Sequence, residues 1–330
     1  MPQGKGGLGA VALDGKIYVI AADVNYEYTP STDAWVAKTP MPTPRSNFGI
    51  AVIGNEIFVI GGLIGDNSGT GVNEVYDPAT DTWGKKTSMP TPRWLLEANA
   101  LNDKIYLIGG IGGRNVTEVY DPATDSWSTK ASPLTPIDDY ASAVLDNKVY
   151  IIGGHEGGGM FTNGVQIYDP ENDSWSYGQP APQKVISATA GVTSDALAPE
   201  RIYVLGVTEY IGIGTNLGEQ VPVVINQVFD PENDSWSVGT SPAINRLGMA
   251  VAVIEDKLYA IGGYTYESSG IHVTHEPSAI NEQYTPLCYG TPTPTASPHS
   301  SEFFWTVLIA LLVVAVVIAA IAIYLKKHKR

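Results

Sequence analysis

The chain has 330 residues, of which 44% are hydrophobic and 16% charged, with 35 glycines and 23 prolines. This composition is typical of a large, turn-rich β domain that can bury a sizeable core. The formal net charge of −15 excludes nonspecific binding to nucleic acid, because so acidic a surface repels a polyanion. The single cysteine, Cys288, excludes an internal disulfide.

Short apolar stretches separated by turn residues begin near the N-terminus and continue to about residue 286. In one unit they span 48–53, 56–60, 73–76 and 82–86, with Gly, Pro, Asn and Asp between them. Such β-branched runs predict four short strands joined by turns. The region lacks the amphipathic period of a helix, so an all-β fold is expected.

This unit recurs along the chain and carries two anchors. The first is an apolar strand that most units close with glycine, at 17–22, 57–62, 105–110, 149–154, 202–206 and 258–263. The second is an aromatic residue, in most units followed by Asp-Pro and by Trp seven positions on. The aromatic residues are Tyr28, Tyr76, Tyr120, Tyr168, Phe229 and Tyr284. Spacings of 44 to 61 residues predict propeller blades rather than a helical solenoid.

The double glycine, the Tyr and Trp seven residues apart, and the Pro-Arg pairs Pro44-Arg45 and Pro92-Arg93 resemble the kelch repeat. The resemblance implies a six-bladed β-propeller of four-stranded antiparallel blades over residues 1–289. A single blade cannot bury both of its faces, so the stacking of blades around an axis supplies the core. The fold says little about function, because one fold hosts many functions.

The sixth repeat is incomplete, because Thr291 stands seven positions after Tyr284, where Trp is expected. Kelch propellers commonly complete the last blade with a strand from the other end of the chain. We therefore expect a missing strand, together with a signal segment, upstream of Met1. The alternative is a true start at Met1 with an open sheet edge, in a tail-anchored protein that faces the cytoplasm.

The C-terminal region differs in character from the repeats. Residues 290–302 are rich in Pro, Thr and Ser and predict an extended stalk. Residues 303–325 contain no charged side chain and suffice to cross about 30 Å of hydrocarbon, which predicts a transmembrane helix rather than a buried soluble helix. The basic tail, 326–330, predicts a cytoplasmic C-terminus and an extracellular propeller. This plan is similar to that of archaeal cell-surface kelch proteins.

Candidate binding residues lie on the face that carries the connections between second and third strands, which vary most between units. These connections are 63–72, 111–115, 155–164, 207–225 and 264–280. Superposition of the units places Lys5, Arg45, Arg93 and Arg246 at one equivalent position, with Lys184 near it, and Ile137 interrupts the series. The pattern predicts a basic axial mouth for an acidic partner. The alternative is structural, with the arginines bonded to carbonyls or to an acid of the neighbouring blade.

Aromatic side chains on the two longest connections, Tyr210, Tyr264 and Tyr266, are expected to add contact energy beside these arginines. The neighbours His155 and Glu156 are further binding candidates. Three glycosylation sequons begin at Asn115, Asn172 and Asn233, although two of them coincide with the repeated Asn-Asp-Ser-Trp turn.

No catalytic residue, metal site or cofactor is predicted. His272 and His275 offer two imidazoles, but a loop pair without further ligands is usually not a metal site. Nucleophile elbows and phosphate-binding loops are absent from the sequence. We therefore predict a membrane-anchored module that binds protein or glycan through its loop face. Because kelch enzymes include copper-radical oxidases and a sialic-acid mutarotase, an extracytoplasmic enzyme that acts on carbohydrate is the alternative.

Overall fold

The computed structural model describes residues 1–157, 160–212, 220–269 and 272–286. The chain divides into Met1–Gly290 and Thr291–Arg330, and the second unit lies wholly outside the described residues. The predicted stalk (290–302), transmembrane helix (303–325) and basic tail (326–330) therefore also lie outside them. Among the residues that the structure describes, no helix is long and apolar enough to cross a membrane.

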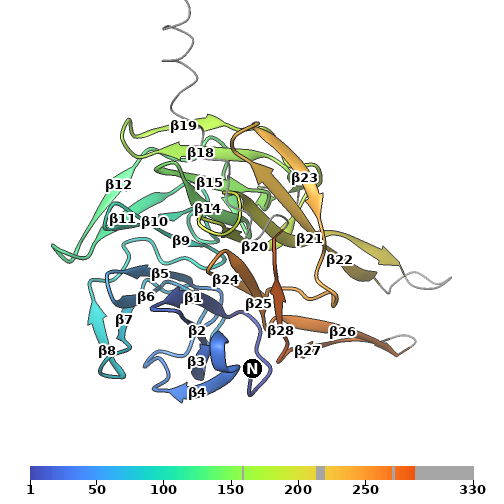
Figure 1. The fold of residues 1–330 in the computed structure, drawn as a ribbon. Helices are drawn as coiled ribbons and strands as arrows, with labels where there is room; N and C mark the ends of the chain where they lie inside the picture. Colours follow the sequence, from blue (N-terminus) through green and yellow to red (C-terminus); the bar gives the residue numbers. More distant parts are fainter. Residues whose placement is uncertain (158–159, 213–219, 270–271, 287–330) are drawn as a thin grey trace, which may run out of the picture. The chain divides into compact units, whose positions relative to one another are not determined.

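Five four-stranded antiparallel sheets follow one another along the chain, each with its strands in sequence order (Figure 1). The first contains β1 (Gly9–Leu13), β2 (Lys16–Ala21), β3 (Val24–Thr29) and β4 (Ala34–Lys38), with a 3₁₀ turn at Pro30–Thr32. The second contains β5 (Gly49–Ile53), β6 (Glu56–Ile60), β7 (Asn73–Asp77) and β8 (Thr82–Lys86). The third contains β9 (Ala98–Leu101), β10 (Lys104–Ile108), β11 (Thr117–Asp121) and β12 (Ser126–Lys130).

The remaining sheets continue this order with two additions. The fourth contains β14 (Ala141–Leu145), β15 (Lys148–Ile152), β18 (Val165–Asp169) and β19 (Ser174–Tyr177), and the fifth β20 (Ile186–Val192), β21 (Ile202–Gly212), β22 (Gln220–Asp230) and β23 (Ser235–Gly239). The last has three described strands, β24 (Ala250–Ile254), β25 (Lys257–Ile261) and β28 (Asn281–Tyr284). Two small sheets pair β13 (Ile137–Asp138), β16 (His155–Glu156) and β17 (Met160–Phe161), and β26 (Tyr264–Ser269) with β27 (His272–Pro277).

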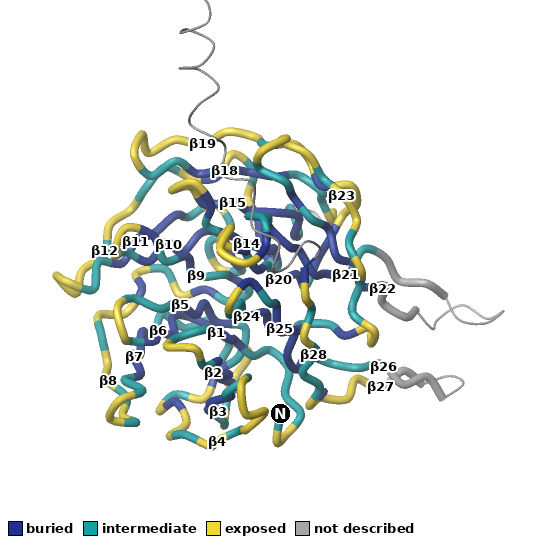
Figure 2. Tube along the Cα trace, viewed as in Figure 1, coloured by how far each residue is buried: buried dark blue, intermediate teal, exposed yellow. Residues whose placement is uncertain are grey.

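The first strands of the sheets form a closed ring. β1 contacts β5, β5 contacts β9, β9 contacts β14, β14 contacts β20, β20 contacts β24, and β24 contacts β1. The apolar core lies between adjacent sheets: Phe58 and Ile60 of the second sheet, for example, belong to one cluster with Ile105 and Leu107 of the third. Inner strands are accordingly buried, while the outermost strands and turns are exposed (Figure 2).

The Tyr, Asp and Trp side chains that recur in the repeats attach each sheet to the preceding one. The Tyr76 hydroxyl donates to Asp81 Oδ1 at 2.6 Å, and the same oxygen accepts the Thr39 amide at 2.9 Å. The Trp83 indole stacks on Tyr76 with ring centroids 5.1 Å apart and donates to the Thr39 carbonyl at 2.8 Å. Trp127, Trp175 and Trp236 make the equivalent bond to the preceding sheet. The recurring carboxylate is therefore structural.

The glycine pairs after the second strands are required by close backbone approach. Gly109 and Gly110 have φ angles of 58° and 92°. A Cβ atom at Gly109 would lie 2.3 Å from the Ile137 carbonyl oxygen, which is too close for any side chain. These glycines thus allow the chain from the next sheet to pass directly against the strand end.

The predicted strands of the second unit are confirmed to within one residue at each end. The predicted loops 207–225 and 264–280 are corrected by the structure. β21 and β22 extend well into the first of these connections, and β26 and β27 form a hairpin within the second. Alternating β-branched and aromatic residues there support strand pairing beyond the sheet itself.

Candidate functional site

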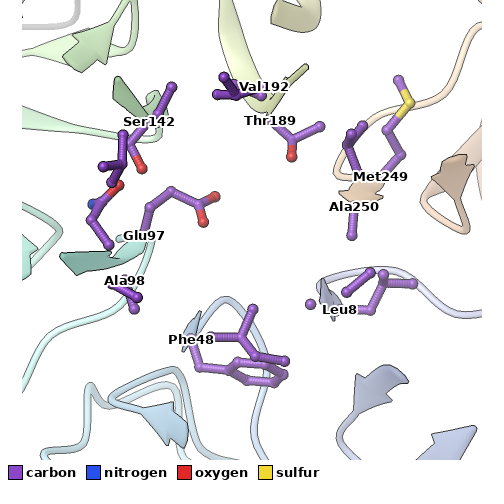
Figure 3. A pocket seen from close by; sticks show the side chains of 18 residues that line it. Leu8, Phe48, Glu97, Ala98, Ser142, Thr189, Val192, Met249 and Ala250 are labelled. Carbon is purple, nitrogen blue, oxygen red and sulfur yellow. The ribbon is translucent and has the colours of Figure 1, made fainter. Parts of the chain in front are cut away.

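A cavity of about 310 Å³ lies where the first strands of the ring meet (Figure 3). All six of the larger sheets contribute to it, and the lining includes Leu8, Phe48, Glu97, Ser142, Thr189 and Met249. A smaller cavity of about 100 Å³ adjoins it at the starts of these strands and shares Leu8, Phe48, Glu97 and Met249 with it. We call the larger one the axial cavity and the smaller one the axial mouth.

The axial mouth opens on the face predicted to bind. Each first strand is antiparallel to its second strand, so that Ala98 at the start of β9 pairs with Leu107 near the end of β10. The start of a first strand therefore lies beside the connection that follows the second strand. The connections that vary most between units and the mouth thus occupy the same face.

Six equivalent residues with left-handed backbone surround the mouth. They are Gly7, Asn47, Leu95, Asp139, Ser187 and Gly248, with φ between 45° and 61°. Backbone hydrogen bonds run from one to the next: the Asn47 amide donates to the Gly7 carbonyl at 3.1 Å, and the Leu95 amide to the Asn47 carbonyl at 3.0 Å. The Asp139 amide continues the series by donating to the Leu95 carbonyl at 3.3 Å. This hydrogen-bonded belt fixes the shape of the opening.

Glu97 is the exception at its position in the repeat. The equivalent residues, two after each left-handed residue, are Gly9, Gly49, Ala141, Thr189 and Ala250. The Glu97 carboxylate points into the axial cavity (Figure 3), and no hydrogen bond to it is found within the described part of the chain. Burial, with a smaller contribution from the negative charge of Asp139, raises the pKa of Glu97 to about 8.

A second carboxyl group, Asp139, stands at the mouth. Ser187 donates its hydroxyl to Asp139 Oδ2 at 3.1 Å. Burial raises the pKa of Asp139 to about 6, although the bonds from Ser187 favour its charged form. Glu97 and Asp139 therefore both exchange protons near neutral pH. Paired carboxyl groups with raised pKa values in a cleft are typical of functional sites.

The preceding residue, Asp138, forms an ion pair with the partly exposed Arg114. Asp138 is buried and accepts a hydrogen bond from Arg114 Nε. His155 Nδ1 lies 3.5 Å from Asp138 Oδ1 and 3.5 Å from Arg114 Nη2, because β13 and β16 pair across the fourth unit. The predicted candidates His155 and Glu156 thus lie on β16, with His155 close enough to Asp139 to favour its charged form.

The predicted basic mouth is not formed, which is a correction to the sequence analysis. Arg45, Arg93 and Arg246 are only 1%, 0% and 0% exposed. Each donates to backbone carbonyls of its own sheet and pairs with a carboxylate on the third strand: Arg45 Nη1 with Glu74 at 2.5 Å, Arg93 Nη2 with Glu118 at 2.9 Å, and Arg246 Nη2 with Glu282. These bonds occupy most of the donors, although Arg246 Nε has no hydrogen-bond partner among the described residues, and the side chains therefore brace the sheets instead of lining the opening.

In two other units the residues at these positions change together, which supports the structural role. Where the arginine is replaced by Ile137 or Val185, the third-strand acid is replaced by Gln166 or Gln227. The Gln166 amide then bonds the Thr135 backbone, accepting at 2.8 Å and donating at 3.0 Å. A charged pair and a neutral substitute therefore occupy the same buried place in different sheets.

The repeat motifs and the ring of antiparallel sheets can now be compared with known proteins. A family model described as the KLHDC2/KLHL20/DRC7 Kelch-repeats domain matches residues 6–206. The chain belongs to the kelch repeat family. The solved structure of YjhT has a TM-score of 0.71 and 18% identity to this kelch chain, and the match covers 87% of this chain and 96% of that one. At that identity the likeness concerns the fold alone.

Two curated proteins share part of the kelch sequence. The human influenza virus NS1A-binding protein and its mouse homolog are each 36% identical to this chain over 70 residues. The matched segment is 19% of this chain and 11% of either relative, so the chain spans about a tenth of their length.

The other predicted site residues are not brought together at the mouth by any contact described. Tyr264 begins β26, where its backbone exchanges two hydrogen bonds with Leu247, at 2.8 and 3.0 Å. Tyr210 lies on β21 and Tyr266 on β26, but their side chains lie outside the described parts of the structure. Their role in binding remains a prediction.

The sequons and the histidine pair lie away from the axial cavity lining. Asn115, Asn172 and Asn233 are exposed, and the amides of the last two bond Asp169 and Asp230 within their turns. His272 and His275 lie on β27. Over the described ranges, no group of three or more His, Cys, Asp or Glu side chains is arranged to hold a metal ion.

Sequence reasoning missed the residues that the kelch fold places at the axis: Glu97, Asp139 and Ser187. They come from three sheets, and each occurs within a repeat that otherwise resembles its neighbours. The available signal was a departure from the repeat, because an acid stands at Glu97 where other units have glycine, alanine or threonine.

Proposed function

We propose that this kelch propeller binds a protein partner at its axial mouth. Kelch domains generally mediate protein–protein interactions. The observation that carries the proposal is the axial cavity, into which the Glu97 carboxylate points without a hydrogen-bond partner among the described residues. The carboxylate oxygens are therefore available to a ligand that enters the cavity, which favours a role in recognition.

We further infer that the propeller has six blades. The five four-stranded sheets and the three-stranded sheet, with first strands in a closed ring, support this count. The last blade would then need a fourth strand beside β28, at the place where the other sheets carry their Trp. Thr291 stands seven positions after Tyr284, where the other units carry their Trp or its equivalent.

The propeller would be displayed outside the cell on a stalk. This part of the proposal rests on the sequence: 303–325 carries no charge, and five residues with four basic side chains follow it. The similarity in plan to archaeal cell-surface kelch proteins, and a glycan as a further ligand, are proposed on the same basis.

Site-specific photo-crosslinking tests the binding site. A photoreactive phenylalanine analogue replaces Trp94, which stands one residue before the left-handed Leu95 of the mouth, or Val36, which is 48% exposed on the outer strand β4. The partner should crosslink from the first position and not from the second. Thr189→Trp, which would fill the axial cavity, should abolish the crosslink in a chain with unchanged thermal unfolding. Crosslinking that survives this filling would place the partner elsewhere.

A second candidate function is acid–base chemistry on a carbohydrate. Two carboxyl groups with raised and different pKa values at one cavity favour it, since such pairs supply a general acid and a general base. Hydrolysis or mutarotation of a panel of glycosides, measured for the chain and for Glu97→Gln, tests this alternative. Turnover that Glu97→Gln leaves intact would exclude these carboxyls from catalysis.

A further inference from the structure

We propose that the axial mouth recognises a basic side chain, lysine or arginine, which a partner polypeptide inserts toward the Glu97 and Asp139 carboxylates. This inference rests on the proposed function and specifies the chemistry of the partner. It reverses the acidic partner expected from the sequence, because the arginines that suggested one are buried in ion pairs.

The charge around the mouth is unbalanced within the part of the chain that the structure describes. The basic groups nearest in the repeat are already engaged: Arg93 pairs with Glu118, and Arg114 pairs with Asp138. Among the described residues, no cationic side chain lines the axial cavity or the mouth. A cation beside a carboxylate favours its charged form, and a ligand can supply that cation.

An independent observation in the same cavity points to a polar occupant. Asn99 lines the axial cavity and is only 4% exposed, yet its Nδ2 has no hydrogen-bond partner within the described ranges. Buried amide donors are almost always bonded in folded proteins. A peptide suits both groups, because it carries a cationic side chain for Glu97 and carbonyl oxygens that can accept a hydrogen bond from the Asn99 amide.

The walls suit the aliphatic part of such a side chain. Leu8, Phe48 and Met249 contribute to both the mouth and the axial cavity, and Ile50 and Val251 extend the apolar lining inward. Lysine and arginine pack their methylene stems on apolar surfaces while the charged group stays with polar partners. A volume of about 310 Å³ lies at the lower end of the range for ligand pockets, which favours one inserted side chain over a larger group.

Binding of the cation should release protons. Glu97 faces Asp139 and Tyr140, and Asp139 faces Ser187, Asp138 and His155. Because burial raises the pKa of Glu97 to about 8, this group is largely protonated at pH 7 and must lose its proton to solvent when the cation binds. Affinity should therefore rise with pH, by up to about tenfold per pH unit below pH 8.

The probe is the acetylated, amidated pentapeptide Gly-Gly-Lys-Gly-Gly, titrated into the full chain at pH 6, 7 and 8.5 by calorimetry. Peptides with norleucine or glutamate in place of lysine serve as ligand controls. We expect the lysine peptide to bind at least tenfold more tightly than either, and more tightly at pH 8.5 than at pH 6. Equal binding of the norleucine peptide would overturn the inference. So would equal or tighter binding of lysine amide or putrescine, since the mouth would then take small amines.

Two variants test the residues. Glu97→Gln keeps the shape of the side chain and should weaken binding of the lysine peptide at least tenfold at pH 8.5 and flatten its pH dependence. The matched control, Glu171→Gln, makes the same change in an exposed turn and should leave both unchanged. Thermal unfolding of each variant monitors the fold, and a folded Glu97→Gln variant with unaltered peptide binding would refute the role of Glu97.

The inference and the proposed function can fail separately. If a partner crosslinks at Trp94 but the lysine peptide does not compete with it, the basic side chain is excluded while protein binding at the mouth stands. If nothing crosslinks at Trp94 and filling the cavity has no effect on partner binding, the proposed function itself is wrong.

Discussion

Replacing the buried Arg–Glu pair of the third sheet with the uncharged Ile and Gln of the fourth sheet tests how the buried arginines act. The change is Arg93→Ile with Glu118→Gln, which reproduces the pair Ile137 and Gln166. The side chains of Arg93 and Glu118 are 0% and 4% exposed, and they meet at 2.9 Å. Either single change therefore leaves one buried charge without its counter-charge, at a cost of about 3 kcal/mol each.

The double variant should lose much less than the sum of the single ones. Neither charge remains, and the new Gln can bond the Thr91 backbone as Gln166 bonds the Thr135 backbone. The Gly109 and Val116 carbonyls still lose the donors that Arg93 supplies, at 2.9 and 3.0 Å. We expect a total loss of about 2–3 kcal/mol, which implies a coupling of about 3 kcal/mol between the two sites.

Urea denaturation of the full chain and of the three variants measures this double-mutant cycle. Additive losses, with the double variant about 6 kcal/mol less stable, would refute the reasoning that the two residues form one buried unit. The axial mouth provides a control, since binding of the lysine peptide should survive in the folded double variant.

Three further outcomes are expected. Trp83→Phe keeps the stack on Tyr76 but removes the bond to the Thr39 carbonyl, and should lower the free energy of unfolding by about 1 kcal/mol in urea denaturation; no loss would contradict the attachment role. Glu97→Gln should match the wild-type free energy of unfolding near pH 4 but exceed it by about 1–3 kcal/mol at pH 8. The reason is that burial raises the pKa of Glu97 in the folded state, so the wild type loses stability as the pH rises above the pKa of Glu97 in the unfolded chain. Deletion of 303–330 should move the protein from the membrane pellet to the supernatant, and continued sedimentation would disprove the anchor.

Local spacing was enough to predict the sheets. The strands 56–60 and 82–86, the turn before Trp83 and the attachment through Tyr76 all arise within about 30 residues, so a repeated pattern reveals them directly. The glycine pairs are also predictable from the sequence, because only glycine tolerates both the left-handed backbone and the close carbonyl at those points.

Strand extension beyond the sheets was not predicted from the same patterns. The connections 207–225 and 264–280 depart from the repeat and read as loops, yet paired strands occupy much of each. Two segments pair only where they share a register. Here the sheet from which both segments extend sets that register, so it cannot be read from either segment alone.

Sequence by itself determined the repeat, the all-β class and the kelch family, because these follow from residues close together in the chain. Only the tertiary structure decided which side chains reach the axis. Arg93 and Glu97 stand four residues apart, on either side of the left-handed Leu95; the first turns into its own sheet to pair with Glu118, and the second turns into the axial cavity. The closed ring then brings Glu97 together with Asp139 and Ser187 from two other sheets, a juxtaposition that no local pattern encodes.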